Sequence, residues 1–327
     1  MAKGDDQGGR AASQDEEGGM MESATGRAID MWAPIVPVPE VMRHVSEHFP
    51  AEMAGYLRVF YKREPRAEEF RNSARALEMS EEAVLAALDA AGIEQTLITG
   101  FDEWSSVHET FIPNELVADL AERHPRRFIP FAGVDLLKGM DAVRELEHLV
   151  RDRGFRGLSL RPFMIGLPAD DRRYYPLYAK CVELEIPLSI HTSANWTTVS
   201  VSDLGHPRHL DPVAADFPEL QIVMSHAGYP WVLEAALLAW KYPNVYLELA
   251  AHRPKYLATP GTGWEPLLRF GQTTIKEKVL FGTGWFLLGR PPGQILDEFR
   301  ALPVNEDVLE LWLHGNAERL LGIAVAA

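Results

Sequence analysis

The sequence predicts a single (β/α)8 barrel of the TIM type. Short apolar runs alternate with helical patterns along most of the 327-residue chain. No Gly-x-Gly-x-x-Gly motif or phosphate-binding loop follows the first run, which disfavours a nucleotide-binding sheet. Strand–helix alternation indicates a parallel sheet, and about eight such units indicate a closed barrel.

The expected strands are short and apolar, as is typical of buried parallel strands. In chain order they are 27–32, 95–99, 128–134, 157–161, 186–191, 220–226, 245–249 and 278–281. The helical patterns between and after them are 40–48, 80–91, 114–123, 141–153, 175–185, 210–217, 231–241 and 294–321. Ser80 is expected to cap the second of these helices and Gly92 to end it.

The barrel is expected to occupy residues 27–327. Residues 1–26 are rich in Gly, Asp, Glu and Ser and have too little apolar surface to offset the cost of ordering, which predicts a flexible tail without a signal peptide. Residues 51–79 carry several aromatic side chains and are expected to form a helical insertion, either a lid or an interface element.

The composition limits the partners of the protein. The net charge of −15 argues against nucleic acid and anionic membranes, and no apolar run is long enough to span a bilayer. A small-molecule substrate is therefore the expected partner. The lone Cys181 cannot form an intramolecular disulfide, which suits a cytoplasmic location, and it is expected to be a buried apolar residue.

Two predicted strands end in histidine. The first reads Ile186-Pro-Leu-Ser-Ile-His191, and the second reads Leu220-Gln-Ile-Val-Met-Ser-His226. In a (β/α)8 barrel the carboxyl ends of the strands meet at the face that carries the active site. His191 and His226 are therefore predicted to be catalytic acid–base groups or metal ligands. The alternative is that each is an inert, hydrogen-bonded core histidine.

These motifs, in this order, resemble the amidohydrolase-related family and its aminocarboxymuconate-semialdehyde decarboxylase-like branch. Further matching segments are Asp216 to Gly228, Tyr242 to Tyr246, Val279 to Thr283 and Gly315 to Gly322. The resemblance implies a (β/α)8 barrel, commonly oligomeric, that performs metal-assisted decarboxylation, hydration or hydrolysis, often on aromatic or unsaturated acids. It implies a homo-oligomer here, with a dimer as the expected state.

The metal motifs of that family are incomplete. The first strand normally ends in Asp-x-His-x-His, and the chain reads Asp30-Met31-Trp32-Ala33-Pro34 instead. The eighth normally ends in Gly-Ser/Thr-Asp, and the chain has Gly282-Thr283-Gly284. No cofactor is therefore expected. A divalent metal such as zinc stays an alternative, held by His191 and His226 with completion from Glu248, His252 or Asp30.

Four residues are predicted to bind substrate: Arg161, Trp32, Trp285 and Glu248. Arg161 ends the fourth strand and suits a bidentate carboxylate grip, although a structural ion pair with Glu248 or Asp135 is an equal alternative. The two tryptophans follow strands and suit a planar ring, as do Trp104 and Trp196. The alternative for Glu248 is an ion pair with an arginine.

Three functions follow from these patterns. The first is an enzyme acting on a small aromatic or unsaturated carboxylated compound by acid–base chemistry, as a decarboxylase, hydrolase or cyclase. The second is a non-catalytic barrel that binds a small molecule or a partner. The third is a metal-dependent hydrolase or decarboxylase with a rearranged metal site.

Overall fold

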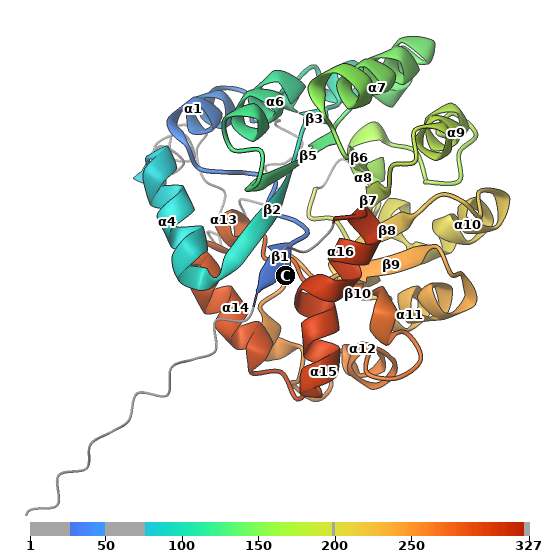
Figure 1. Cartoon of the computed structure of the whole chain (residues 1–327). Helices are drawn as coiled ribbons and strands as arrows, with labels where there is room; N and C mark the ends of the chain where they lie inside the picture. Colours follow the sequence, from blue (N-terminus) through green and yellow to red (C-terminus); the bar gives the residue numbers. More distant parts are fainter. Residues whose placement is uncertain (1–26, 50–75, 198–199, 324–327) are drawn as a thin grey trace, which may run out of the picture.

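Eight parallel strands form the centre of the molecule (Figure 1). The computed structural model describes residues 27–49, 76–197 and 200–323. The strand order in the sheet follows the chain. The strands are β1 (Ala28–Asp30), β2 (Ile93–Thr99), β5 (Phe128–Ala132), β6 (Gly157–Leu160), β7 (Leu188–His191), β8 (Ile222–Ser225), β9 (Val245–Glu248) and β10 (Val279–Leu280).

Backbone hydrogen bonds join the two edges of this sheet. The N–H of Met31, just after β1, donates to Phe281 O at 2.9 Å, and the N–H of Gly284 donates to Trp32 O at 2.8 Å. Since these bonds link the segments that follow the first and last strands, the sheet closes into a ring. The predicted TIM-type barrel is confirmed.

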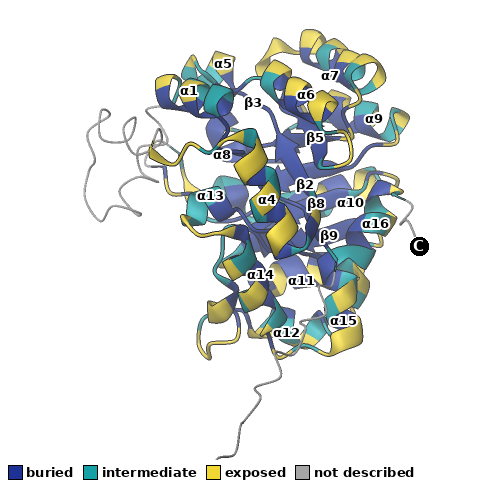
Figure 2. Cartoon of the chain, turned by 60° about the vertical axis from the view of Figure 1, so that its left-hand side comes forward, coloured by how far each residue is buried: buried dark blue, intermediate teal, exposed yellow. Residues whose placement is uncertain are grey.

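Helices surround the barrel and turn their buried faces inward (Figure 2). They are α1 (Pro39–Glu47), α4 (Glu81–Ala91), α5 (Trp104–Val107), α6 (Asn114–Arg123), α7 (Met140–Arg153), α8 (Pro162–Ile165), α9 (Tyr175–Glu183), α10 (Asp211–Asp216), α11 (Val232–Lys241), α12 (Glu265–Phe270), α13 (Trp285–Leu288), α14 (Pro292–Arg300), α15 (Glu306–Glu310) and α16 (Asn316–Leu321). Ser80 caps α4 by accepting a hydrogen bond from Ala83 N, and Gly92 ends it with φ 74°, as predicted.

Two local predictions are wrong. The expected helix over 294–321 is interrupted between α14 and α15, where Pro303 cannot continue a helix. A small antiparallel pair, β3 (Phe101–Asp102) with β4 (Thr110–Ile112), lies in what was expected to be a loop. Strands this short leave almost no periodicity in the sequence.

Parts of the expected domain plan lie outside the described residues. These parts are the tail over 1–26 and nearly all of the insertion predicted over 51–79. Within the described ranges, none of the helices has the length and apolar character needed to cross a membrane.

Candidate functional site

His191 and His226 lie together at the carboxyl ends of neighbouring strands. His191 ends β7 opposite Ser225 of β8, and His226 follows Ser225 directly. Their ring centroids are 5.1 Å apart. His226 and Ala227 have φ 66° and 48°, a left-handed conformation that turns the chain sharply after the strand. The site prediction that both histidines share one rim of the barrel agrees with this geometry.

The tautomer of His226 follows from its hydrogen bond. Nδ1 lies 3.0 Å from Ala250 O, and a carbonyl oxygen can only accept, so Nδ1 carries the proton and Nε2 carries the lone pair. Burial lowers the pKa of His226 to about 4. The ring is therefore neutral at physiological pH and arranged to accept a proton at Nε2.

His191 is neutral for the same reason. Burial, with help from the neighbouring His226 and Arg161, lowers its pKa well below the usual range. Nε2 lies 3.1 Å from Ser193 Oγ, and that hydroxyl oxygen also lies 3.2 Å from Ala194 O. Nδ1 is buried without a hydrogen-bond partner in the described part of the chain.

A third imidazole continues the row. His252 follows β9, and its ring centroid lies 6.3 Å from that of His226. It packs against Trp264 at 4.9 Å and Tyr229 at 5.1 Å. Burial lowers its pKa to about 3, and its Nε2 has no hydrogen-bond partner among the described residues. The sequence suggested His252 only as a residue to complete a metal site.

Glu248 lies beneath this row and is fully buried. Its carboxyl group accepts hydrogen bonds from the backbone N–H groups of His226 (3.3 Å) and Ala250. A Cβ at Gly282 would approach Glu248 Oε1 to 2.0 Å, so this position requires glycine. Burial raises the pKa of Glu248 well above its usual value. Its contacts support the turn that carries His226, whereas the sequence predicted a substrate contact.

Asp30 closes the carboxyl end of β1. It accepts hydrogen bonds from Thr283 N (2.8 Å), Thr283 Oγ1 and Trp32 N (3.1 Å). Burial raises its pKa to about 6, against the lowering effect of these bonds. The carboxyl group is thus engaged in joining the first and last strands.

Arg161 is held in a buried bidentate ion pair. Its Nε and Nη2 donate to the two carboxylate oxygens of Glu103 at 2.7 and 2.6 Å. The guanidinium also lies over the Phe101 ring, 3.8 Å from its centroid. The sequence correctly considered an ion pair but named Glu248 or Asp135 as the partner. Glu103 was missed because it belongs to the unexpected β3–β4 segment.

The tryptophans divide into three environments. Trp32 contacts His226 edge-on, with the ring centroids 4.6 Å apart. Trp285 packs with Ala33 and Ile295 in a separate apolar cluster. Trp104 and Trp196 are 53% and 52% exposed. The aromatic wall beside the histidines therefore includes Trp32 and a ring the sequence did not single out, Phe163, whose centroid is 4.5 Å from that of His191.

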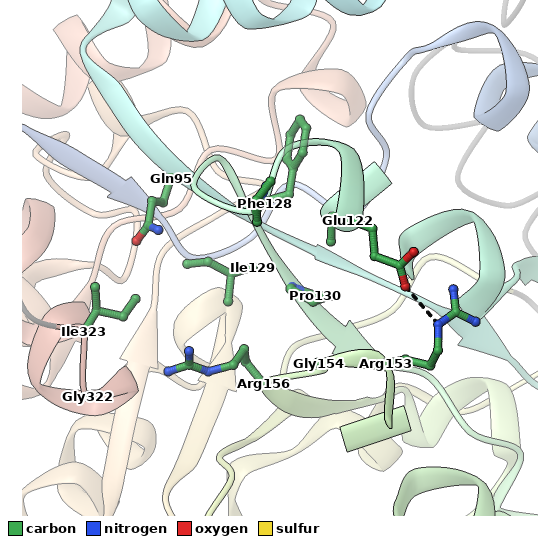
Figure 3. A pocket seen from close by; sticks show the side chains of 12 residues that line it. Gln95, Glu122, Phe128, Ile129, Pro130, Arg153, Gly154, Arg156, Gly322 and Ile323 are labelled. Atoms are coloured by element: carbon green, nitrogen blue, oxygen red, sulfur yellow. Dashed lines mark hydrogen bonds and ion pairs between the residues drawn. The ribbon is translucent and has the colours of Figure 1, made fainter. Parts of the chain in front are cut away.

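A hollow of about 460 Å³ lies at the other end of the barrel (Figure 3). Its wall includes Gln95, Phe128 and Arg156, which stand near the amino ends of their strands, and the ion pair of Arg153 with Glu122 at 2.9 Å. In (β/α)8 barrels this end carries stability and the opposite end carries chemistry. The histidine row therefore remains the candidate site.

A closed (β/α)8 barrel with two strand-end histidines, backed by a buried glutamate, is an enzyme-type scaffold. Residues 29–323 match the family described as amidohydrolase. The chain belongs to the amidohydrolase family, as its motifs predicted.

Curated relatives include enzymes that act on carboxylated compounds. The chain is 31% identical over 143 residues to 2-keto-4-carboxy-3-hexenedioate hydratase of a Sphingobium species, a match that covers 36% of this chain and 41% of the hydratase. It is 25% identical over 252 residues to decarboxylase orsB of Emericella nidulans, covering 64% and 75% of the two chains. The chain thus matches less than half the length of the hydratase.

Solved structures share the fold. An uncharacterised TIM-barrel protein from Bordetella bronchiseptica superposes with a TM-score of 0.69 at 28% identity, covering 90% of this chain and 98% of that one. The 5-carboxyvanillate decarboxylase of Novosphingobium aromaticivorans, in complex with manganese and a nitrobenzoic acid, gives a TM-score of 0.65 at 17% identity, covering 91% and 96%. The latter likeness shows the fold alone.

The described residues of this chain do not fit such a metal. Within the described ranges, no three His, Cys, Asp or Glu side chains are grouped so that they could hold an ion. Trp32 and Pro34 stand where the resemblance places two histidine ligands, and neither side chain can donate a lone pair to a metal. The Asp30 carboxylate is engaged by Thr283 and Trp32. A usual catalytic site needs three protein ligands, and only His191 and His226 carry over.

Proposed function

We propose that this protein is an enzyme that acts on a small, planar, aromatic or unsaturated carboxylated compound by acid–base chemistry. The observation that carries the proposal is the pair of neutral imidazoles of His191 and His226, half-buried and buried respectively, with ring centroids 5.1 Å apart at the carboxyl-end face of the barrel. Each neutral ring has one nitrogen lone pair, and that of His226 lies at Nε2.

Two neutral imidazoles suit a reaction that moves a proton between two atoms. His226 Nε2 accepts a proton from a hydroxyl group of the substrate or from water, and the imidazolium that forms returns a proton to a substrate carbon. Decarboxylation, hydration and cyclisation each need such a transfer. Proton transfer by a positioned side chain contributes about 10²–10⁴-fold in rate, which is enough for an activated substrate and too little for an unactivated amide.

The surroundings of the histidines support a flat substrate. Trp32 and Phe163 place ring edges and faces against His226 and His191. Aromatic walls favour planar, conjugated compounds over flexible aliphatic ones. The names of the hydratase and decarboxylase relatives point to the same substrate class.

Arg161 is proposed as the positive charge that attracts the substrate carboxylate. It lies close enough to lower the pKa of His191 electrostatically. Glu103 engages Nε and Nη2 of Arg161 and offsets part of its charge, so the substrate carboxylate would meet a guanidinium held in a fixed orientation. Trp285 and Glu248 act behind the site, through packing and through support of the His226 turn.

The test is turnover across a panel of hydroxybenzoates and unsaturated di- and tricarboxylates, with wild type, His226→Asn and the exposed control His148→Gln. Turnover of at least one member by wild type and His148→Gln, lost in His226→Asn, supports the proposal. Tight binding of one member without turnover by any variant would contradict it and favour the non-catalytic barrel.

A homodimeric state and a cytoplasmic location complete the proposal. The location rests on the single cysteine, Cys181, which is buried in α9 and, as the sole cysteine, has no disulfide partner within the chain.

A further inference from the structure

One helix of the barrel exposes an apolar line. Leu233, Leu237 and Trp240 of α11 are 59%, 56% and 57% exposed. Their spacing of four and three residues places them on one face of the helix, which we name the α11 stripe. The opposite face carries the helix's contacts with the barrel, through Val232, Ala235, Ala236, Leu238 and Ala239.

The stripe is continuous with its neighbour. The ring of Trp240 lies 5.7 Å from that of Phe270, a half-buried residue at the end of α12, the helix that packs beside α11. Single exposed apolar residues are common on protein surfaces, whereas a contiguous line of large ones marks a contact surface. The α11 stripe thus has the character of an interface.

The charges on this face indicate what covers it. The exposed charged residues of α11 on this face are Glu234 near its start, which lies 3.2 Å from His206 Nε2, and Lys241 at its end, whose Nζ donates to Asp211 at 2.7 Å. Both side chains are about half exposed, so each can also meet a charge of a partner subunit. In an antiparallel pairing of two α11 helices about a two-fold axis at Leu237, Glu234 of each copy faces Lys241 of the partner subunit. Leu233, four residues before the axis, then faces Trp240, three residues after it. A parallel pairing would instead set like charges side by side.

We propose that the α11 stripe is the contact surface of a homodimer with two-fold symmetry. An isologous interface requires one patch that is complementary to itself. The order leucine, acid, leucine, tryptophan, base meets this requirement, because reversal about the central leucine sets leucine against tryptophan and acid against base. The net charge of −15 on each copy opposes association only weakly, since repulsion is screened over about 8 Å at physiological salt. On α11 itself the patch carries one charge of each sign, and Asp211 lies beside Lys241.

Leu237→Cys tests the axis. Residues on a two-fold axis meet their own copies, so mild oxidation should join Leu237→Cys chains by a disulfide. The background is low because the natural Cys181 is fully buried. Leu137→Cys is the matched control, since Leu137 is a leucine 41% exposed on another part of the surface. Cross-linking of Leu237→Cys but not of Leu137→Cys is expected, and equal cross-linking of both would overturn the proposal.

Sedimentation velocity tests the apolar contact. Wild type should sediment as a dimer at micromolar concentration, and Leu237→Glu should weaken the dimer by about 100-fold or more, because it buries an unpaired charge at the centre of the contact. Leu137→Glu should leave it unchanged, and circular dichroism should be that of wild type for both. A monomeric wild type, or a Leu237→Glu variant that still dimerises like wild type, would refute the proposal.

Charge reversal tests the antiparallel orientation. Glu234→Lys alone sets like charges opposite each other at both ends, as does Lys241→Glu alone, so each single variant should dimerise less well than wild type. An equal mixture of the two single variants should recover dimers, because both cross-pairs of the mixed dimer are then opposite in sign. Recovery cannot arise within one chain, where the two positions lie seven residues apart on α11. No recovery on mixing would contradict the antiparallel pairing.

Discussion

The indole of Trp32 meets the imidazole of His226 edge-on, with ring centroids 4.6 Å apart and planes at 86°. Trp32 stands at the first-strand position where the resemblance expects a histidine ligand. An apolar ring thus adjoins the residue that we propose as the proton carrier. The contact excludes water from one side of His226, which contributes to its low pKa through desolvation.

His226→Asn should distinguish the structural role of Nδ1 from the catalytic role proposed for Nε2. The asparagine amide N–H can replace Nδ1–H as the donor to Ala250 O, but nothing replaces the lone pair of Nε2. We expect turnover to fall by about 10²–10⁴-fold with little change in the thermal midpoint. Steady-state kinetics and thermal unfolding check this. A variant that keeps wild-type turnover would remove His226 from the chemistry.

The pH dependence of turnover should reflect a depressed histidine pKa. The neutral form of His226 is the active one, so activity is present above its pKa of about 4 and is lost as the pH falls through that value. We expect a nearly constant rate from pH 7 to pH 5, provided that thermal melts at each pH show a folded protein. Half-loss of activity near pH 6.5 would indicate an unperturbed histidine instead.

Asp30 should make the free energy of unfolding fall as the pH rises. The pKa of Asp30 is about 6 in the native state, above the unfolded value of 3.8. The contribution of Asp30 to the free energy of unfolding is therefore fully present below pH 3.8 and is lost as the pH rises through 6. The stability advantage of wild type over Asp30→Asn should shrink by on the order of 3 kcal/mol between pH 4 and pH 8. Urea unfolding at several pH values measures it. A difference independent of pH would show that the Asp30 pKa is not raised.

The buried pair of Arg161 and Glu103 should depend strongly on both partners. Arg161→Met leaves a buried carboxylate unpaired and should cost about 3–5 kcal/mol of unfolding free energy. The double variant Arg161→Met with Glu103→Leu should recover most of that loss, because an apolar pair of similar size needs no desolvation of charge. A double-mutant cycle by urea unfolding measures both. A single variant as stable as wild type would refute a tight pair.

Sequence reasoning reached the barrel because its signals are local. Each strand is a short apolar run, and each helix carries its own boundary residues, as Ser80 and Gly92 do for α4. The rule that strand ends carry chemistry then placed His191 and His226 on one rim. These inferences need only the order of the elements along the chain.

The remaining site residues depend on contacts between distant segments. The partner of Arg161 is 58 residues away in sequence, and the hydrogen bonds of Asp30 reach 253 residues along the chain to Thr283. From the sequence, Glu248 is predicted to contact the substrate. In the structure its carboxyl group lies beneath His226, where it accepts a hydrogen bond from the backbone N–H of the turn after β8. Trp104 and Trp196 follow strands like Trp32, yet both side chains are exposed, Trp104 at the start of α5 and Trp196 on a loop. Spacing in the sequence does not report such distances or directions.

We expect proton transfer by His226 to proceed without a metal held in the family's usual geometry. The most direct test is turnover of the best substrate of the panel by protein treated with a strong chelator, with metal content measured on the same sample. The turnover rate of the treated protein should stay within about twofold of that of the untreated enzyme, which corresponds to a change of under about 0.5 kcal/mol in activation free energy. Loss of activity on chelation, with recovery on adding one equivalent of manganese or zinc, would contradict it.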